Sequence, residues 1–234
     1  MEKNKKQGFI VTIDGPAASG KSTTARMVAE KLGWLYLDTG AMYRALTLKV
    51  LQRKISLDNT EEIGRLAKTT KIELTPSNKG TKVLLDGKDV SMDIRLPQVD
   101  KAVGPVCEVP AVREIMVASQ RKLGEKGNIV AEGRDMGTVV FPNADLKFFM
   151  VASLKERAKR RQKDLAQQSI NVSVEDLMNE IERRDQRDSN RKNSPLKKAS
   201  DALVIDTTGL SIEEQITFVI NKIQQKMEYE HEKK

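Results

Sequence analysis

The feature that most constrains this 234-residue chain is a glycine-rich loop near its N-terminus. Residues 15–22 read G-P-A-A-S-G-K-S, which matches the pattern G-x-x-x-x-G-K-[ST]. An apolar, β-branched run at 10–13 precedes the loop and a helical pattern follows it, so the pattern stands between a strand and a helix. An ordinary glycine-rich turn does not account for the complete pattern in this setting. We therefore predict a loop that binds a nucleoside triphosphate.

Each residue type in this loop suits the binding of phosphate. Gly15 and Gly20 let the backbone curl so that successive N–H groups point into one concavity at the positive end of the next helix. Lys21 can reach the β- and γ-phosphates, and the hydroxyl of Ser22 can ligate Mg²⁺. The predicted triphosphate-binding residues are Gly15, Pro16, Ala17, Ala18, Ser19, Gly20, Lys21, Ser22 and Thr23, with Mg²⁺ as the cofactor and Ser22 as its ligand.

Strand and helix patterns alternate along the rest of the chain. Strands are predicted at 9–14, 34–38, 128–132, 146–151 and 202–206, and helices at about 21–32, 39–54, 60–68, 110–124, 157–168, 173–194 and 211–225. Thr39 is the predicted N-cap of the second helix. A succession of strand, helix, strand and helix predicts an α/β fold with a parallel sheet and helices on its faces.

The pattern changes between residues 66 and 105. Residues 71–75 and 81–85, with a turn at 76–80, predict an antiparallel hairpin, and Asp86-Gly87 predicts a further turn. We therefore predict a core at 1–65 and 106–225 that carries an insert at 66–105. A lid is predicted at 155–172, and residues 226–234 are predicted to form a flexible tail.

Polar residues follow three of the predicted strands directly. They lie in segments 15–22, 38–44 and 133–135, and we expect all three to line one crevice because ligands bind beyond the carboxyl ends of parallel strands. Arg44, in the second turn of its helix, could bind an acceptor phosphate, although a solvated arginine fits equally well. Arg134 and Asp135 place opposite charges side by side, which would also fit a structural ion pair.

Two later clusters of arginines have helical spacing. Arg184, Asp188 and Arg191 stand at i, i+4 and i+7, so they share one face of the predicted helix and suit a polar ligand, with Arg187 on the same flank. Arg157, Arg160 and Arg161 precede a break at 166–171, which suits a lid that closes over a transferred phosphate. A plain solvated helix face remains open for both clusters.

The net charge of +8 fits either a nucleic-acid surface or a cleft that holds several phosphates. Between residues 155 and 198 the chain has 13 Lys and Arg residues against 8 Asp and Glu residues, and several have the helical spacings described above. This distribution favours a defined site. A basic patch interleaved with aromatic residues is missing from the sequence, so a nucleic-acid partner is not expected.

The composition points to a cytoplasmic protein. The sequence has no run near the roughly 20 apolar residues that a membrane span needs, and residues 1–8 lack the apolar core of a secretory signal. Cys107 is the only cysteine, so a disulfide within the chain is excluded, which suits a reducing compartment. His231 is the only histidine and lies in the polar tail, so a Cys–His catalytic pair is not expected.

Six motifs follow one another along nearly the whole chain. They are I-D-G-P-A-A-S-G-K-S-T (13–23), L-D-T-G-A-M-Y-R (37–44), V-P-A-V-R (109–113), G-R-D-M-G-T-V-V-F-P (133–142), R-D-Q-R-D-S-N-R (184–191) and S-P-L (194–196). In this order and spacing, from about residue 8 to 223, the chain resembles the bacterial cytidylate kinases, a family of nucleoside monophosphate kinases. The resemblance implies a P-loop fold with a five-stranded parallel sheet, flanking helices, an enlarged monophosphate-binding insert and a short lid.

The resemblance also implies a reaction and residue roles. ATP would phosphorylate CMP or dCMP in the presence of Mg²⁺, and we expect a monomer acting on these small molecules. Residues for the acceptor phosphate would be Thr39, Arg44, Arg134 and Arg191; for cytosine, Arg113 and Asp135; for the pentose, Arg184 and Asp188. Lys21, Arg134 and Arg191 would be catalytic. Gly104 stands where family members usually carry serine, so discrimination against uracil could be looser or supplied by a neighbouring residue.

Other readings stay open at this point. A uridylate or shikimate kinase would share the phosphate-binding loop, and phosphorylation of CMP, dCMP, UMP and shikimate would separate them. A P-loop ATPase that binds nucleic acid would fit the basic charge, but no apolar strand ends in a paired Asp-Glu. A GTPase fits less well, because the sequence has no Asn-Lys-x-Asp segment to read guanine.

Overall fold

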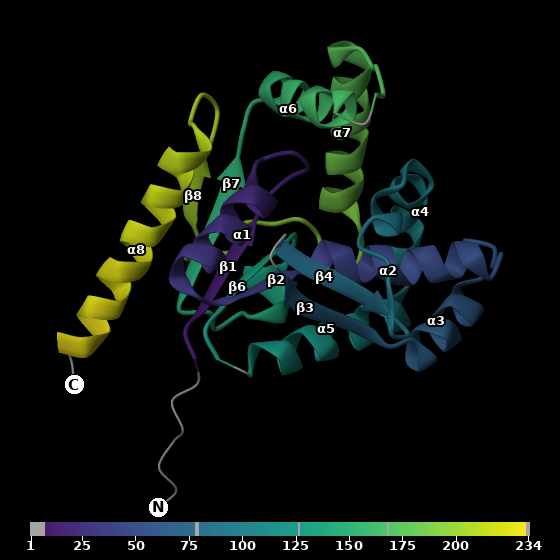
Figure 1. Ribbon diagram of the computed structural model, residues 1–234, viewed down its shortest axis with the longest axis horizontal. Helices are drawn as coiled ribbons and strands as arrows, with labels where there is room; N and C mark the ends of the chain where they lie inside the picture. Colours follow the sequence, from purple (N-terminus) through teal and green to yellow (C-terminus); the bar gives the residue numbers. More distant parts are fainter. Residues whose placement is uncertain (1–7, 78–79, 126, 168, 233–234) are drawn as a thin grey trace, which may run out of the picture. The chain divides into compact units, whose positions relative to one another are not determined.

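The computed structural model describes residues 8–77, 80–125, 127–167 and 169–232. Within these residues a five-stranded sheet has the order β2-β6-β1-β7-β8 (Figure 1). Its strands are β1 (Ile10–Asp14), β2 (Leu35–Asp38), β6 (Ile129–Gly133), β7 (Leu146–Val151) and β8 (Leu203–Asp206). β1 pairs with β7 and β7 pairs with β8 in parallel, and β1 and β6 are buried almost throughout. The predicted parallel sheet is confirmed.

A second sheet is small and antiparallel. Its strands β3 (Ile72–Ser77), β4 (Gly80–Leu85) and β5 (Lys88–Asp89) lie in sequence order, and Ile72 pairs with Leu85. Val83 and Leu85 point into an apolar cluster with Ala45 and Leu48 of the second helix. The predicted hairpin is confirmed, although residues 78–79 of its turn lie outside the described residues.

The helices largely follow the predicted patterns. They are α1 (Lys21–Leu32), α2 (Thr39–Gln52), α3 (Thr60–Thr69), α4 (Pro97–Glu108), α5 (Pro110–Gly124), α6 (Leu154–Ala166), α7 (Val174–Asn190) and α8 (Ile212–Glu232), with a 3₁₀ turn η1 (Asp93–Arg95) and a π-helical turn η2 (Met136–Val140). The side chains of Ser153 and Ser173 accept hydrogen bonds from backbone N–H groups at the starts of α6 and α7, as their capping patterns predict. None of the described helices is long and apolar enough to cross a membrane.

Three differences from the predicted helices concern α2, α4 and α8. Asp38, not Thr39, is the N-cap of α2, because its Oδ1 accepts the N–H of Ala41 at 2.8 Å. α4 was not predicted and begins inside the proposed insert; Gly104-Pro105 resembles a helix break, yet Pro97 starts the helix and its apolar face is buried.

The third difference concerns the C-terminal end. α8 continues to Glu232, so residues 226–232 are helical where the sequence predicted a flexible tail. The remaining tail residues 233–234, the side chain of His231, residue 168 of the predicted lid and residues 1–7 lie outside what the structure describes.

The chain divides into two compact units. One consists mainly of Leu35–Ile129, and the other combines Phe9–Trp34 with Val130–Lys234. The first unit contains the antiparallel sheet with α2 to α5, and the second contains the glycine-rich loop, β1, β6 to β8 and α6 to α8. The proposed insert at 66–105 is therefore one part of a larger compact unit.

Candidate functional site

The glycine-rich loop has the backbone geometry that its sequence predicts. A Cβ on Gly15 would lie 2.2 Å from the carbonyl oxygen of Met150, so only glycine fits where the loop passes β7. Gly20 has a φ of 93° and caps α1 in the left-handed region. Ala18 also has a positive φ, 57°, which is uncommon for a residue with a side chain. The chain holds this loop in a strained, specific shape ahead of the N-terminus of α1.

Lys21 is enclosed by the loop. Its side chain is buried, the whole residue being 6% exposed, and Nζ donates to the carbonyl oxygen of Pro16 at 3.1 Å. Burial, and after it the nearby Arg134, lowers the pKa of Lys21 to about 7, while Glu132 acts in the opposite direction. A negatively charged ligand in the loop would restore the ammonium form.

Ser22 is joined to a carboxylate that sequence reasoning missed. Its Oγ donates to Oε1 of Glu132 at 2.7 Å, and Glu132 is buried at the end of β6. The available signal was a single acid ending the otherwise apolar strand Ile129–Gly133. A hydroxyl beside a carboxylate is a donor set of hard oxygens, which suits Mg²⁺ when it completes its coordination with phosphate oxygens and water. The residues present therefore fit the predicted cofactor.

Arg134 and Asp188 form the charged centre of the second unit. Nε of Arg134 donates to Oδ2 of Asp188 at 2.8 Å, and the two side chains are 16% and 17% exposed. Burial alone would lower the pKa of Arg134, but the carboxylates of Asp188, Glu132 and Asp185 together raise it, with Asp188 contributing most of the three. Burial correspondingly favours a raised pKa for Asp188, but Arg134 holds it below its usual range. Both groups are held in their charged forms.

Arg191 joins this centre from just beyond α7. Its side chain is 7% exposed, and its terminal nitrogens lie 4.0 Å from Oδ1 of Asp188 and from Oδ1 of Asp135. Nε of Arg191 donates to the carbonyl oxygen of Ser194. The helix ends at Asn190, so Arg191 is its C-cap in an extended conformation and does not share the helical face with Arg184 and Asp188 as predicted.

Asp14 fixes the turn that carries these charges. Its two carboxylate oxygens accept the N–H groups of Met136 and Gly137 at 2.9 and 2.8 Å, directly after Asp135. Burial raises the pKa of Asp14 to about 6, and the two backbone donors partly oppose this. The end of β1 thus leads into the glycine-rich loop, and its last residue, Asp14, also anchors the turn that follows β6. In the sequence, Asp14 ends the first predicted strand and stands in the 13–23 motif, but neither pattern indicates this anchoring role.

Arg157, a predicted lid residue, contacts the glycine-rich loop. Its guanidinium donates to the carbonyl oxygens of Ala152 and Ala17 at 3.1 and 3.2 Å and pairs with Asp185 of α7. Asp185 in turn accepts the N–H of Ala17 at 3.3 Å. The N–H and the carbonyl oxygen of Ala17 are therefore both hydrogen-bonded to the Arg157–Asp185 pair. Asp185 was also missed by sequence analysis, although it lies inside the R-D-Q-R-D-S-N-R motif.

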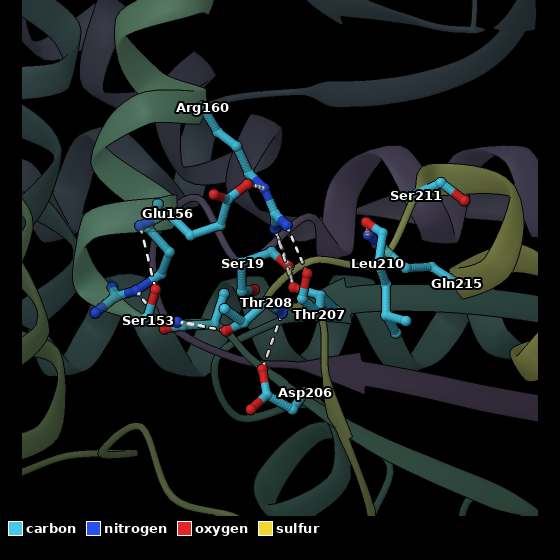
Figure 2. A network of polar contacts seen from close by, with 12 residues as sticks. Ser19, Ser153, Glu156, Arg160, Asp206, Thr207, Thr208, Leu210, Ser211 and Gln215 are labelled. Carbon is cyan, nitrogen blue, oxygen red and sulfur yellow. Dashed lines mark hydrogen bonds and ion pairs between the residues drawn. The ribbon is translucent and has the colours of Figure 1, made fainter.

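Arg160 makes a second connection to the loop (Figure 2). Its Nη1 donates to Ser19 O and Thr207 Oγ1 at 3.4 and 2.9 Å, and its Nη2 donates to Thr207 O at 2.7 Å. Glu156, one turn earlier on α6, accepts from its Nε at 3.0 Å. Arg157 and Arg160 thus brace the loop in this structure. Arg161 on α6 and Arg184 on α7 are partly buried, and Thr23 on α1 is exposed.

In the other unit, α2 presents Thr39 and Arg44. Thr39 is buried at the first position of α2. Arg44 donates from Nη1 to the carbonyl oxygen of Ile94 at 3.2 Å and forms an ion pair with Asp100 of α4. Arg95, which sequence analysis did not select, pairs with the N-cap carboxylate of Asp38 at 2.9 Å.

Arg113 is also buried in this unit. It is 5% exposed, and its guanidinium carbon lies 5.6 Å from the centre of the Tyr43 ring, within the range of a cation–π interaction. Gly104 lies in α4. The structure therefore groups the predicted residues in two sets. Lys21, Ser22, Arg134, Asp135, Arg157, Arg160, Arg161, Arg184, Asp188 and Arg191 belong to the second unit, and Thr39, Arg44 and Arg113 belong to the first.

A parallel five-stranded sheet with this loop and these buried cations defines a kinase of the P-loop class. The family model described as cytidylate kinase matches residues 11–225. Among curated proteins, the chain is 47% identical to the cytidylate kinase of Carboxydothermus hydrogenoformans over 92% of this chain and 97% of that protein. It is 48% identical to the cytidylate kinase of Bacillus subtilis over 97% and 99% of the two chains. The chain belongs to the cytidylate kinase family.

A solved structure shows the same fold at low identity. An uncharacterized protein from Eubacterium ventriosum aligns with a TM-score of 0.51 and 12% identity, over 92% of this chain and 98% of that one. This likeness concerns the fold alone.

Proposed function

We propose that this protein transfers the γ-phosphate of ATP to CMP or dCMP, giving ADP and CDP or dCDP. The observation that carries the proposal is the phosphate-binding loop with its buried Lys21, beside the Arg134–Asp188 pair, in a chain of this family. The cytidylate kinases of C. hydrogenoformans and B. subtilis support CMP as the acceptor.

The proposed reaction depends on positive charge that stabilises the phosphates, and it needs no general base. An oxygen of the CMP phosphate is already anionic, so no proton has to be removed before it attacks the γ-phosphorus. The barrier lies in bringing two anions together and in stabilising charge on the equatorial oxygens of the transferred group. We assign that task to Lys21, Arg134 and Arg191. The carboxylates of Asp188 and Asp135 keep the two arginines oriented.

Mg²⁺ is the proposed cofactor, and Ser22 with Glu132 would hold it together with the ATP phosphates. When bound, it would neutralise phosphate charge and orient the β- and γ-phosphates. Residues 15–23 would supply the backbone donors for those phosphates. Because Ser22 Oγ donates to Glu132 here, metal binding would replace this hydrogen bond with coordination by the same oxygens.

For the acceptor, we propose that Thr39 and Arg44 bind the phosphate with Arg134 and Arg191. Arg113 and Asp135 would recognise cytosine, and Arg184 and Asp188 the pentose. The burial of Arg113 supports its proposed role in cytosine recognition, because a buried guanidinium can hydrogen-bond to a base edge with little competition from water. We also retain Arg157, Arg160 and Arg161 as lid residues that exclude water, with the first two already bonded to the loop.

The remaining parts of the proposal concern context. We propose a cytoplasmic protein, for which the single cysteine, Cys107, is suitable. We propose that it acts as a monomer on small-molecule substrates, with neither nucleic acid nor membrane as a partner.

The substrate panel tests this function. ADP release would be measured with ATP and either CMP, dCMP, UMP or shikimate at equal concentration. We expect CMP and dCMP to give the highest kcat/KM, with measurable UMP activity if Gly104 relaxes cytosine selection. Preference for UMP or shikimate over both cytidine nucleotides would overturn the proposal. ATP hydrolysis without any acceptor dependence would favour the ATPase reading instead.

A further inference from the structure

Two ion pairs connect α2 with the segment that runs from η1 into α4. Arg44 of α2 pairs with Asp100 of α4, and Arg95 of η1 pairs with Asp38 at the start of α2. The α2 segment therefore contributes the arginine to one pair and the aspartate to the other. All four residues belong to the first unit.

The guanidinium of Arg44 is held at two points. Nη2 pairs with Oδ1 of Asp100, and Nη1 donates to the carbonyl oxygen of Ile94 at 3.2 Å. The planar guanidinium is thus fixed along one edge, since two bonds from two different nitrogens leave it no free rotation. An arginine tethered in this way loses little further entropy when a phosphate binds its remaining donors.

Asp100 is suited to hold this edge. Its side chain is 16% exposed and that of Arg44 is 12% exposed, so water screens the pair weakly. Asp100 lies in the first turn of α4, where the helix dipole favours a carboxylate. The ion pair therefore persists without help from a ligand.

We propose that Asp100 is a positioning residue for Arg44 and thereby sets the affinity for the phosphate of the acceptor nucleotide. The proposal rests on the proposed function, in which Arg44 binds that phosphate. Asp100 touches no reacting atom. It acts by keeping Arg44 in the orientation in which its other N–H groups can receive a phosphate, so the loss of Asp100 weakens a phosphorylated acceptor and spares an unphosphorylated one.

The test compares the binding of CMP and of cytidine by isothermal titration calorimetry. The dissociation constant for cytidine divided by that for CMP measures how much the phosphate contributes to binding, and this quotient is the ratio used below. We expect Asp100→Ala to reduce this ratio about tenfold and Asp100→Asn, which keeps an acceptor oxygen, to reduce it about threefold. Cytidine binding stays unchanged in both variants. A purely structural role would weaken CMP and cytidine together.

Two further variants distinguish the positioning role of Asp100 from the proposed phosphate-binding role of Arg44. Asp89→Asn removes an exposed negative charge in the same unit, from a carboxylate bonded to Ser91, and should leave the ratio unchanged. Arg44→Ala should reduce the ratio at least as much as Asp100→Ala, and adding Asp100→Ala to it should have no further effect.

The outcomes are distinguishable. If Arg44→Ala reduces the ratio and Asp100→Ala leaves it unchanged or raises it, the positioning role is overturned and the role of Arg44 stands. If Arg44→Ala itself leaves the ratio unchanged, the phosphate-binding role of Arg44 fails, and the inference about Asp100 fails with it. If Asp100→Ala does not fold, Asp100→Asn decides by the same ratio.

Discussion

The glycine-rich loop and the α2–α4 region both surround cations, but they do so in different ways. Around the loop, Lys21, Arg157 and Arg160 donate mainly to backbone carbonyl oxygens of the loop itself and of its neighbours. Around α2, Arg44 and Arg95 form ion pairs with carboxylates from distant segments. The first region is a backbone cradle braced by side chains, and the second is assembled from paired side chains.

This difference suggests different sensitivities to substitution. A backbone cradle keeps its shape when one side chain is removed, so a variant there should lose chemistry without losing structure. Removing one side chain of an ion pair leaves its partner without a counter-charge. A variant in the α2–α4 region should therefore also disturb the orientation of the remaining side chain or the stability of the fold.

The largest effect is expected for Lys21→Ala. The variant removes the lysine that we propose to stabilise charge on the transferred phosphate, and we expect kcat to fall about 1,000-fold. Because burial lowers the pKa of Lys21 to about 7, its charge does not stabilise the empty fold, and the melting temperature should not fall. Steady-state ADP release and thermal denaturation measure the two quantities.

The matched control is Lys31→Ala. This lysine lies on the same helix, α1, and forms an exposed ion pair with Glu213. It should leave kcat within about twofold, because Lys31 lies in the last turn of α1, away from the loop at the helix start, and exposed pairs contribute little to stability. A turnover of Lys21→Ala within tenfold of the unaltered protein would show that the cradle works without its lysine.

Arg191→Ala should have the next largest effect. The variant removes a donor from the charged centre at Asp188 and Asp135, and we expect kcat to fall about 100-fold. Arg187→Ala is the control, because Arg187 is exposed on the neighbouring turn of α7. Single-turnover phosphorylation of CMP would separate chemistry from product release. Equal rates for the two variants would remove Arg191 from the catalytic set.

Asp188→Ala should affect binding and stability together. The variant leaves Arg134 without its 2.8 Å partner, so we expect an unfolding free energy lower by about 2 kcal/mol, below the 3–5 typical of fully buried pairs. We expect the KM for CMP to rise about tenfold and the KM for ATP to change little. Urea denaturation and initial rates provide the measurements. An unchanged KM for CMP would count against the acceptor role.

The contrast between the regions also explains what the sequence could predict. The glycine-rich loop was found because Gly15, Gly20, Lys21 and Ser22 lie within one short segment of the sequence, and the hairpin at 71–85 was found because its register depends on a local turn. Ser22 and Glu132 are 110 positions apart, and Arg44 and Asp100 are 56 apart, so no local pattern joins them. Their pairing follows only from the tertiary fold.

Local rules also failed where two signals competed. Thr39 is a good N-cap, but Asp38 precedes it and its carboxylate takes that role. Gly104-Pro105 resembles a break, but Val99, Ala102, Val103 and Val106 bury one face of α4 and maintain the helix. The extended conformation of Arg191 could not be read from helical spacing, because the spacing does not show where α7 ends.

A smaller effect concerns protons taken up by Lys21. With a pKa of about 7 in the empty loop, Lys21 is largely neutral at pH 8, and bound ATP should restore its usual high pKa. On ATP binding, Lys21 should therefore take up about 0.9 proton at pH 8 and about 0.1 at pH 6, while the γ-phosphate of ATP releases any proton that it carries. Calorimetry in buffers of different ionisation enthalpy, on the unaltered protein and on Lys21→Ala, measures the lysine's share as the difference between the two proteins. Equal uptake at both pH values would contradict the neutral form.

The most direct test of the division between the two regions is equilibrium binding of ATP and CMP, each alone, to the unaltered protein, Lys21→Ala and Arg44→Ala. We expect Lys21→Ala to weaken ATP by more than about tenfold and to leave CMP within about twofold, and Arg44→Ala to show the reverse. Circular dichroism would confirm that both variants are folded. If either variant weakens both nucleotides equally, the loop and α2 do not bind different substrates, and the account is contradicted.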